Sequence, residues 1–393
     1  MPDGKSPSDQ HVVLAGAGHA HVEVLRRLGA RPVPGVRLTL VTPGLHTPYS
    51  GMLPGLIAGH YTFDQAHINT AKLSAYAGAR LVLASVRNVD GKARTLSCDN
   101  GVTISFDILS LDTGSTPNTA GVAGTVEHAI PVKPIDRFLP AFEALIERAR
   151  QAGWKRRIAV VGGGAGGVEL MLALAHRLRR EARASGSNGG GPSFLLVTAE
   201  PELLTSFPES MRHRFLQIMM ERGIAVFTAA RVVCVASDRI ELETGGDIAA
   251  DEVLWVTEAQ APGWLRDTAL PLDERGYLKV DACLRVESTA GIFAAGDMTA
   301  FAPHPLPKSG VYAVRAGPVL DRNIRSALTG QPLSRYRPQR DALYLITTGD
   351  RHAIGTRNGI VLEGDWVWRF KDWIDRRFMA RYQRVAPAPP HET

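Results

Sequence analysis

The chain has 393 residues, 45% hydrophobic and 21% charged, and this length predicts two or three globular domains. Its 45 Lys and Arg against 39 Asp and Glu leave a net charge of +6, too small an excess to indicate nucleic-acid binding. No apolar run predicts a membrane span, and residues 1–10 lack the apolar core of a secretion signal, so we expect a cytoplasmic protein.

The three cysteines, Cys98, Cys234 and Cys283, are scattered along the chain. None has the spacing of a redox disulfide or of a metal site, so we predict ordinary thiols in a reducing compartment and no bound metal.

Two apolar runs that end in glycines predict two dinucleotide sites. Residues 12–15 and 158–161 are such runs, and each is followed by helix-forming sequence. The glycines are Gly16 and Gly18 after the first run, and Gly162, Gly164 and Gly167 after the second. A strand, a glycine turn and a helix expose backbone N–H groups and a positive helix end, which suit a pyrophosphate. Two such units predict a protein that passes electrons between two dinucleotides.

Further elements follow in chain order. We expect strands over 36–42, 79–86, 106–115, 193–198 and 252–257, a helix over about 135–151, and a mobile loop over 185–192. A glycine motif at residues 292–297 returns to the first unit. The predicted fold class is therefore α/β, with two Rossmann-like dinucleotide-binding domains, the second inserted in the first, and a C-terminal α/β element.

Four motifs in this order resemble the FAD-dependent pyridine nucleotide-disulfide oxidoreductase superfamily over about residues 11–330. They lie at residues 16–18, 111–117, 162–169 and 293–297. The loop at 47–59 resembles the branch of type II NADH dehydrogenases and sulfide:quinone reductases. The most similar family is a flavoprotein found alone or fused ahead of selenide, water dikinase, on the evidence of segments 18–25, 49–55 and 347–351.

The resemblance implies FAD and NAD(P)H as cofactors. It places an FAD-binding domain at 1–125 and 286–335, an NAD(P)-binding domain at 126–285, and a C-terminal domain at 336–393. The implied FAD-binding residues are Gly16, Gly18, Thr42, Val86, Gly114, Gly296, Asp297, Val311 and Tyr312. The implied NAD(P)-binding residues are Gly162, Gly164 and Gly167. Asp297 is expected to accept hydrogen bonds from the ribityl chain, or alternatively to cap the next segment, and a helix starting near Lys308 is expected to direct its N–H groups at the flavin.

Several positions depart from the family pattern. His21 replaces the third glycine of the first motif, and Thr42 and Thr198 replace the acids that usually bind ribose. Glu258 replaces a glycine. His19 and His21 either contact phosphate or are packed or solvated.

Glu169, expected in the first helical turn after the second motif, receives by resemblance a role in handling a proton or orienting the nicotinamide. The alternative is a carboxylate that complements the helix N-terminus. The loop at residues 45–52 contains no cysteine, so we expect the acceptor to meet the flavin directly. Tyr49, Met52 and Leu53 then either line a site for a quinone-like ring or pack in the core.

Residues 366–382 gather three of the six tryptophans and five basic residues at helical spacing. This helix either lies at a membrane interface, which would make the protein peripheral to the membrane, or docks on the protein body.

The sequence thus predicts an FAD-dependent NAD(P)H oxidoreductase that reduces a small, quinone-like acceptor without a redox disulfide. Two alternatives are a flavoprotein acting on sulfur or selenium species, and a flavin-binding partner or sensor with low turnover. The sequence predicts no oligomeric state.

Overall fold

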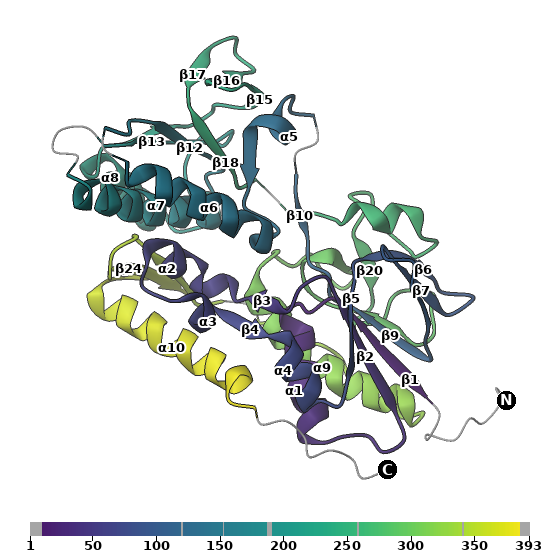
Figure 1. Cartoon of the computed structure of the whole chain (residues 1–393). Helices are drawn as coiled ribbons and strands as arrows, with labels where there is room; N and C mark the ends of the chain where they lie inside the picture. The colour runs from purple at the N-terminus through teal and green to yellow at the C-terminus, as the bar shows by residue number, and fades with distance from the viewer. Residues whose placement is uncertain are drawn as a thin grey trace.

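The computed structural model describes residues 10–118, 121–151, 153–186, 191–257, 259–339 and 342–385. Figure 1 shows two lobes, each built on a sheet, with a C-terminal element lying against both. Glu258 and part of the loop predicted at 185–192 lie outside the described residues.

A parallel five-stranded sheet forms the centre of the first lobe. Its strands, in spatial order, are β21 (Ile292–Ala294), β9 (Ile108–Leu111), β1 (His11–Ala15), β2 (Arg37–Thr42) and β5 (Arg80–Leu83). The β-branched and leucine side chains of β1 are fully buried, as expected for a strand covered on both faces. Helices α1 (His19–Ala30), α4 (Thr70–Tyr76) and α9 (Gly310–Leu328) belong to this lobe.

The second lobe is inserted in the first and also has a parallel five-stranded sheet at its centre. Its parallel strands are β11 (Ala129–Pro131), β18 (Glu252–Trp255), β12 (Arg157–Val161), β13 (Ser193–Val197) and β14 (Ile224–Phe227). Its main helices are α6 (Ile135–Ala149), α7 (Ala165–Ala184) and α8 (Glu209–Glu221). Because β21 returns to the first sheet after this lobe, the predicted fold class and the insertion are confirmed.

Each lobe carries a small antiparallel sheet, inserted between β5 and β9 in the first lobe and between β14 and β18 in the second. In the first it is β6 (Val86–Asp90), β7 (Thr95–Cys98) and β8 (Thr103–Ser105), and in the second it is β15 (Val232–Val235), β16 (Arg239–Leu242) and β17 (Asp247–Ala249). The strand predicted over 79–86 is therefore wrong in extent, since β5 ends at Leu83 and Val86 begins β6.

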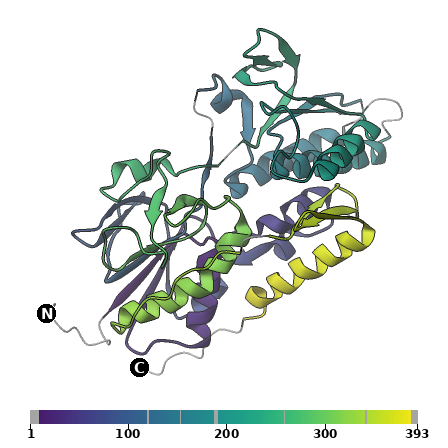
Figure 2. The same ribbon diagram turned by 180° about the vertical axis from the view of Figure 1, so that it is seen from behind.

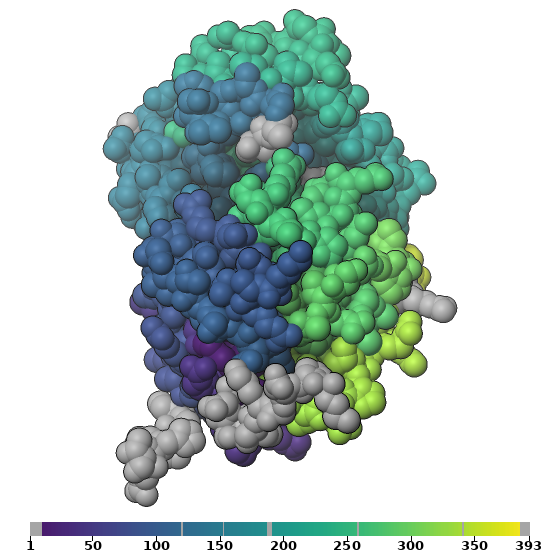
Figure 3. Space-filling model, turned by 90° about the vertical axis from the view of Figure 1, so that its right-hand side faces the viewer, coloured from purple at the N-terminus to yellow at the C-terminus, as the bar shows by residue number. Residues whose placement is uncertain are grey.

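The remaining short elements connect the lobes and flank the glycine turns. They are β3 (His46–Pro48), η2 (Ser50–Met52), α2 (Leu53–Ala58), α3 (Phe63–Ala66), β4 (His67–Asn69), β10 (Thr116–Pro117), α5 (Thr125–His128), β19 (Ala259–Gln260), η3 (Gly263–Asp267), β20 (Leu278–Val280), η4 (Gly296–Met298) and β22 (Thr299–Phe301). Strands β10 and β19 pair where the chain crosses between the lobes. Figure 3 shows the teal second lobe stacked on the blue and green first lobe.

The division into domains stays a proposal, and core packing bears on one of its boundaries. Ala261, Leu265 and Leu270 are buried in the same hydrophobic core as β1. The packing therefore favours a return to the first domain near residue 260, earlier than residue 286.

The C-terminal element consists of a three-stranded antiparallel sheet and one long helix. The strands are β23 (Tyr344–Thr347), β24 (Ala353–Arg357) and β25 (Ile360–Gly364), and the helix is α10 (Asp365–Gln383). The element contacts α7 of the second lobe through β23 and β4 of the first lobe through α10, and Figure 2 shows it in yellow from behind.

Candidate functional site

The first glycine turn lies where β1 passes the end of β9. Gly16 has φ +92°, and a Cβ atom there would lie 2.2 Å from the backbone oxygen of Asp112. Only glycine fits this conformation and this approach. The Gly18 N–H then donates to the same oxygen, at 3.2 Å, and α1 begins at the next residue.

His21, at the third glycine position, packs beneath this turn. Its side chain is fully buried, with Nδ1 2.6 Å from the Gly16 oxygen and Nε2 2.8 Å from Ser110 Oγ. Burial lowers the pKa of His21 to about 4, so the neutral ring donates from Nδ1 and accepts from Ser110. This favours the packed alternative for His21.

The Asp112 carboxylate occupies the N-terminal end of α1. Its Oδ2 accepts hydrogen bonds from the N–H groups of Ala20, at 2.9 Å, and His21, at 3.1 Å. A Cβ at Gly18 would lie 2.3 Å from this carboxylate. Burial raises the pKa of Asp112 to about 7, and Asp297 contributes in the same direction. A titratable anion thus lies at the place where the sequence predicts the FAD pyrophosphate.

Asp297 follows β21 and joins a polar cluster from three parts of the chain. Its Oδ2 is 3.3 Å from Lys133 Nζ and accepts from Ser115 Oγ at 3.4 Å. Gly114 and Gly296, both at positive φ, flank the cluster. Lys133 was not predicted from the sequence, because 164 positions separate it from Asp297.

Helix α9 begins at Gly310, close to its expected start, and Val311 and Tyr312 are in its first turn. Lys308, just before it, has its pKa lowered to about 8 by burial, while Asp297 opposes this shift. Thr42 is buried at the end of β2, with its hydroxyl 3.5 Å from the Gly44 oxygen.

The second glycine turn repeats the geometry of the first. Gly162 has φ +133°, and a Cβ there would lie 2.3 Å from the Val256 oxygen of the adjacent strand end. A Cβ at Gly167 would lie 1.9 Å from the Gly162 oxygen. In contrast, a Cβ at the exposed Gly164 would meet no atom within 4 Å. Packing among the described residues does not require glycine at Gly164, which is consistent with its predicted role of letting a dinucleotide approach the backbone.

Thr198 is buried beneath this turn, so Gly163 could not carry a Cβ without meeting the threonine side chain at 2.7 Å. The Thr198 hydroxyl accepts from the Glu200 N–H at 3.2 Å.

The prediction that Glu169 lies in the first turn of its helix is wrong. Because α7 starts at Ala165, Glu169 lies after the first turn. Its Oε1 accepts hydrogen bonds from the Thr347 N–H, at 2.7 Å, and hydroxyl, at 2.8 Å. The carboxylate therefore points to β23 and does not complement its own helix end. Burial raises the pKa of Glu169, and Lys371 partly opposes this rise.

A cavity of about 1100 Å³ brings several predicted residues together. Tyr49, Glu169 and Val311 all line it, while Met52 is fully buried in the first core, which favours the packing alternative for Met52. The Tyr49 ring stacks on Phe378 with centroids 4.4 Å apart.

Two residues of α10 complete this cavity and were not predicted from the sequence. Lys371 and Asp375 are both buried and form an ion pair of 2.6 Å, and the Lys371 ammonium also donates to the Gly51 oxygen. The Tyr49 hydroxyl lies beside Asp375, and burial together with this carboxylate raises the pKa of Tyr49. The spacing of Lys371 and Asp375, one helical turn apart, was the only available signal.

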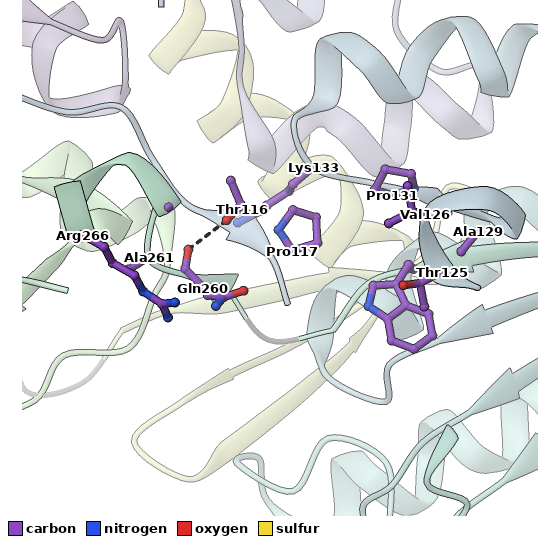
Figure 4. Close-up of a pocket in the computed structure, with 12 residues that line it drawn as sticks. Thr116, Pro117, Thr125, Val126, Ala129, Pro131, Lys133, Gln260, Ala261 and Arg266 are labelled. Carbon is purple, nitrogen blue, oxygen red and sulfur yellow. Dashed lines mark hydrogen bonds between the residues drawn. The ribbon is translucent and has the colours of Figure 1, made fainter. Parts of the chain in front are cut away.

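A second cavity, of about 400 Å³, lies at the crossing between the lobes (Figure 4). Figure 4 shows Thr116 bonded to the Gln260 backbone oxygen, with Arg266 extending toward the same place. Lys133 lines this cavity and contacts Asp297, so the cavity adjoins the predicted FAD site.

The residues present fit two dinucleotides. At the first site, His19 Nε2 is buried and, within the described part of the chain, has no hydrogen-bond partner. At the second, the open space at Gly164 leaves room for a pyrophosphate at the start of α7. Two parallel-sheet domains with these turns define an α/β oxidoreductase that binds two dinucleotides.

Residues 10–317 match the family described as pyridine nucleotide-disulphide oxidoreductase, so the chain belongs to this family. It is an FAD-dependent oxidoreductase, and FAD and NAD(P)H, the predicted cofactors, are those of the family.

The chain is 27% identical to demethylphylloquinone reductase NdbB of Synechocystis over 287 residues, which cover 69% of this chain and 68% of that protein. It is 22% identical to the type II NADH:quinone oxidoreductase of Staphylococcus aureus, covering 93% and 94%. The sulfide:quinone oxidoreductase of Aquifex aeolicus shares the fold, with a TM-score of 0.78 at 19% identity, covering 98% of this chain and 94% of that one.

We predict that Gly167→Ala lowers the stability of the protein, whereas Gly164→Ala lowers its affinity for NAD(P)H. The Cβ that Gly167→Ala adds would clash with the Gly162 oxygen, so this change should lower the free energy of unfolding by about 3 kcal/mol. Gly164→Ala should leave the melting temperature nearly unchanged but weaken NAD(P)H binding roughly tenfold. Thermal melting and cofactor titration measure the two effects, and equal melting temperatures for both variants would contradict the assignment.

We predict that FAD affinity falls as pH rises above about 7. Bound pyrophosphate favours the neutral form of Asp112, so above its pKa each binding event must take up a proton, and Kd should rise by up to about tenfold per pH unit. Equilibrium dialysis of the holoenzyme across pH measures this. Asp112→Asn should flatten the profile, and exposed Asp136→Asn should not. If Asp112→Asn keeps the slope, Lys308 and not Asp112 is the titrating group.

Proposed function

We propose that this protein transfers electrons from NAD(P)H through FAD to a small, quinone-like acceptor without a redox disulfide. The observation that most supports this proposal is the 1100 Å³ cavity, which joins the aromatic residue Tyr49, the acid Glu169 and the first turn of α9 at Val311. Bound FAD would supply two-electron chemistry, accepting hydride from NAD(P)H and releasing electrons to the acceptor.

The acceptor end of the cavity suits a flat ring. Tyr49 and Phe378 stack on each other, and Gly51 lines the cavity next to them, where a Cβ would lie 2.9 Å from the Tyr49 ring. Offset stacking of such rings contributes about 1 kcal/mol beyond area burial. The carbonyl oxygens of a bound quinone could then face the polar groups of α10.

Reducing a quinone to a quinol consumes two protons as well as two electrons. Burial raises the pKa of Glu169 and of Asp375, so both carboxyl groups hold protons more readily than exposed acids. The Lys371 ammonium interacts electrostatically with both carboxylates. One proton is carried with the hydride from NAD(P)H, and we propose that Glu169 supplies the other, with Lys371 and Asp375 positioning the Glu169 carboxyl group.

Glu169→Gln should slow the reduction of menadione by about 10²-fold, because the amide cannot donate a proton as an acid. Reduction of ferricyanide, which takes up no proton, should be nearly unaffected. Steady-state rates with the two acceptors measure this, with Glu209→Gln on the exposed start of α8 as the matched control. Equal losses with both acceptors would show that Glu169 acts on the NAD(P)H side or in folding.

The cysteines give no support to a thiol relay. Cys98, Cys234 and Cys283 are all free, and none of them lines either cavity described above. Cys98 is in β7 of the first lobe and Cys234 in β15 of the second, in the two separate small sheets.

The variant with all three cysteines changed to serine should therefore retain its NAD(P)H:menadione activity within about twofold, since no thiolate is needed as nucleophile or redox carrier. Activity is compared at equal FAD content, with the melting temperature as the control for folding. If this variant lost turnover while it kept its FAD and its fold, a cysteine would take part in the reaction, as in sulfide oxidation.

We also propose peripheral membrane contact through residues 366–382. Trp366, Phe370 and Trp373 are exposed on α10, a pattern that suits a lipid headgroup region. No helix among the described residues is long and apolar enough to cross a membrane.

The alternative activity on sulfur or selenium species rests on the sequence motifs alone. One of them, residues 347–351, has a structural role, since Thr347 binds Glu169 and a Cβ at Gly349 would lie 2.2 Å from the Leu172 oxygen.

The other alternative is a flavin-binding sensor with low turnover. Rapid bleaching of the flavin by NADH in stopped flow would distinguish an enzyme from such a sensor.

A further inference from the structure

The outer part of the large cavity is strongly basic. Its lining includes nine cationic side chains against three carboxylates, those of Glu23, Glu169 and Asp375. The cations are Arg26, Arg27, Arg315, Arg322, Arg335, Arg337, Arg377, Arg381 and Lys371. They come from α1, α9, α10 and the segment after α9, so four separate parts of the chain converge on one groove.

The three carboxylates are already engaged within the protein. Glu23 pairs with Arg26 and Arg27, at 2.8 and 2.6 Å, and accepts from the Tyr382 hydroxyl. Asp375 pairs with Lys371, and Glu169 accepts from Thr347.

Six arginines of the lining remain without a carboxylate partner in the described part of the chain: Arg315, Arg322, Arg335, Arg337, Arg377 and Arg381. All six are exposed. Guanidinium groups brought together without counter-charges repel one another, so a bound anion would relieve this repulsion.

The position of the arginines along α9 indicates where the anion lies. The helix lines the cavity from Gly310 to Arg322, which at 1.5 Å per residue is about 18 Å. Arg315 lies about 8 Å along this axis from Gly310, and Arg322 lies at the far end. Tyr49, proposed to contact the reacting ring, and Val311 in the first turn of α9 are thus at one end of the groove, and the arginines without carboxylate partners extend away from them.

We propose that this groove binds the anionic end of an elongated electron acceptor, whose ring reaches Tyr49 and whose carboxylate or phosphate lies among the arginines of α9 and α10. Arg forms bidentate bonds with either anion. The proposal rests on the proposed function for the identity of the reacting ring, but the anion site can be tested without turnover.

The experiment compares a naphthoquinone that carries an ω-carboxyalkyl chain with its methyl ester, which has the same ring and differs in charge. Wild-type kcat/KM should favour the acid by about tenfold at low salt, and the ratio should fall with ionic strength. In Arg315→Gln/Arg322→Gln the ratio should fall toward one. Arg87→Gln/Arg183→Gln, on exposed sites outside the cavity, makes the same change of net charge and should keep the wild-type ratio.

Calorimetric titration of the oxidised holoenzyme with the redox-inert dimethoxynaphthalene acid and ester tests binding alone. Tighter binding of the acid than of the ester, lost in Arg315→Gln/Arg322→Gln, supports the anion site. If neither quinone is reduced but this binding preference is found, only the proposed function is refuted. Equal binding of acid and ester overturns the inference. If the double variant loses flotation with phosphatidylglycerol vesicles but keeps the wild-type preference for the acid, the arginines bind lipid headgroups and the inference is also overturned.

Discussion

Both predicted dinucleotide sites depend on one constraint, the close approach of a glycine turn to the backbone end of the neighbouring strand. At Gly16 a Cβ would lie 2.2 Å from the Asp112 oxygen, and at Gly162 it would lie 2.3 Å from the Val256 oxygen. In each lobe the turn follows the central strand and presses on the strand beside it, β9 or β18. A side chain at either position would separate these strands and move the helix N-terminus that the dinucleotide requires.

The C-terminal element connects the two lobes at the place where the proposed acceptor binds. Thr347 holds Glu169 of the second lobe, whereas Lys371 donates to the Gly51 oxygen of the first. Tyr382, further along α10, bonds to Glu23 of α1. These contacts fix two walls of the cavity relative to each other, so the element forms part of the site.

The glycine turns, and the strands and helices that flank them, were predictable because they depend on residues adjacent in sequence. Glu169 was placed on the correct helix but one turn too early, since glycines at 166 and 167 belong to α7 and not to the loop before it. The ion pair of Lys371 and Asp375 with the loop at Gly51 could not be predicted, because 320 positions separate Lys371 from Gly51. Contacts at such distances depend on how the elements pack, which local patterns do not specify.

The structure of α10 shows why the amphipathic sequence of residues 366–382 was compatible both with docking on the protein body and with a membrane interface. Val367, Phe378 and Tyr382 dock on the body, whereas Trp366, Phe370 and Trp373 stay exposed. A third set of side chains on the helix, which includes Arg377 and Arg381, lies along the groove. Docking and membrane contact therefore do not exclude each other. A net charge of +6 summed over the chain hides this arrangement, because folding gathers nine cations around one cavity and leaves the rest of the surface closer to balance.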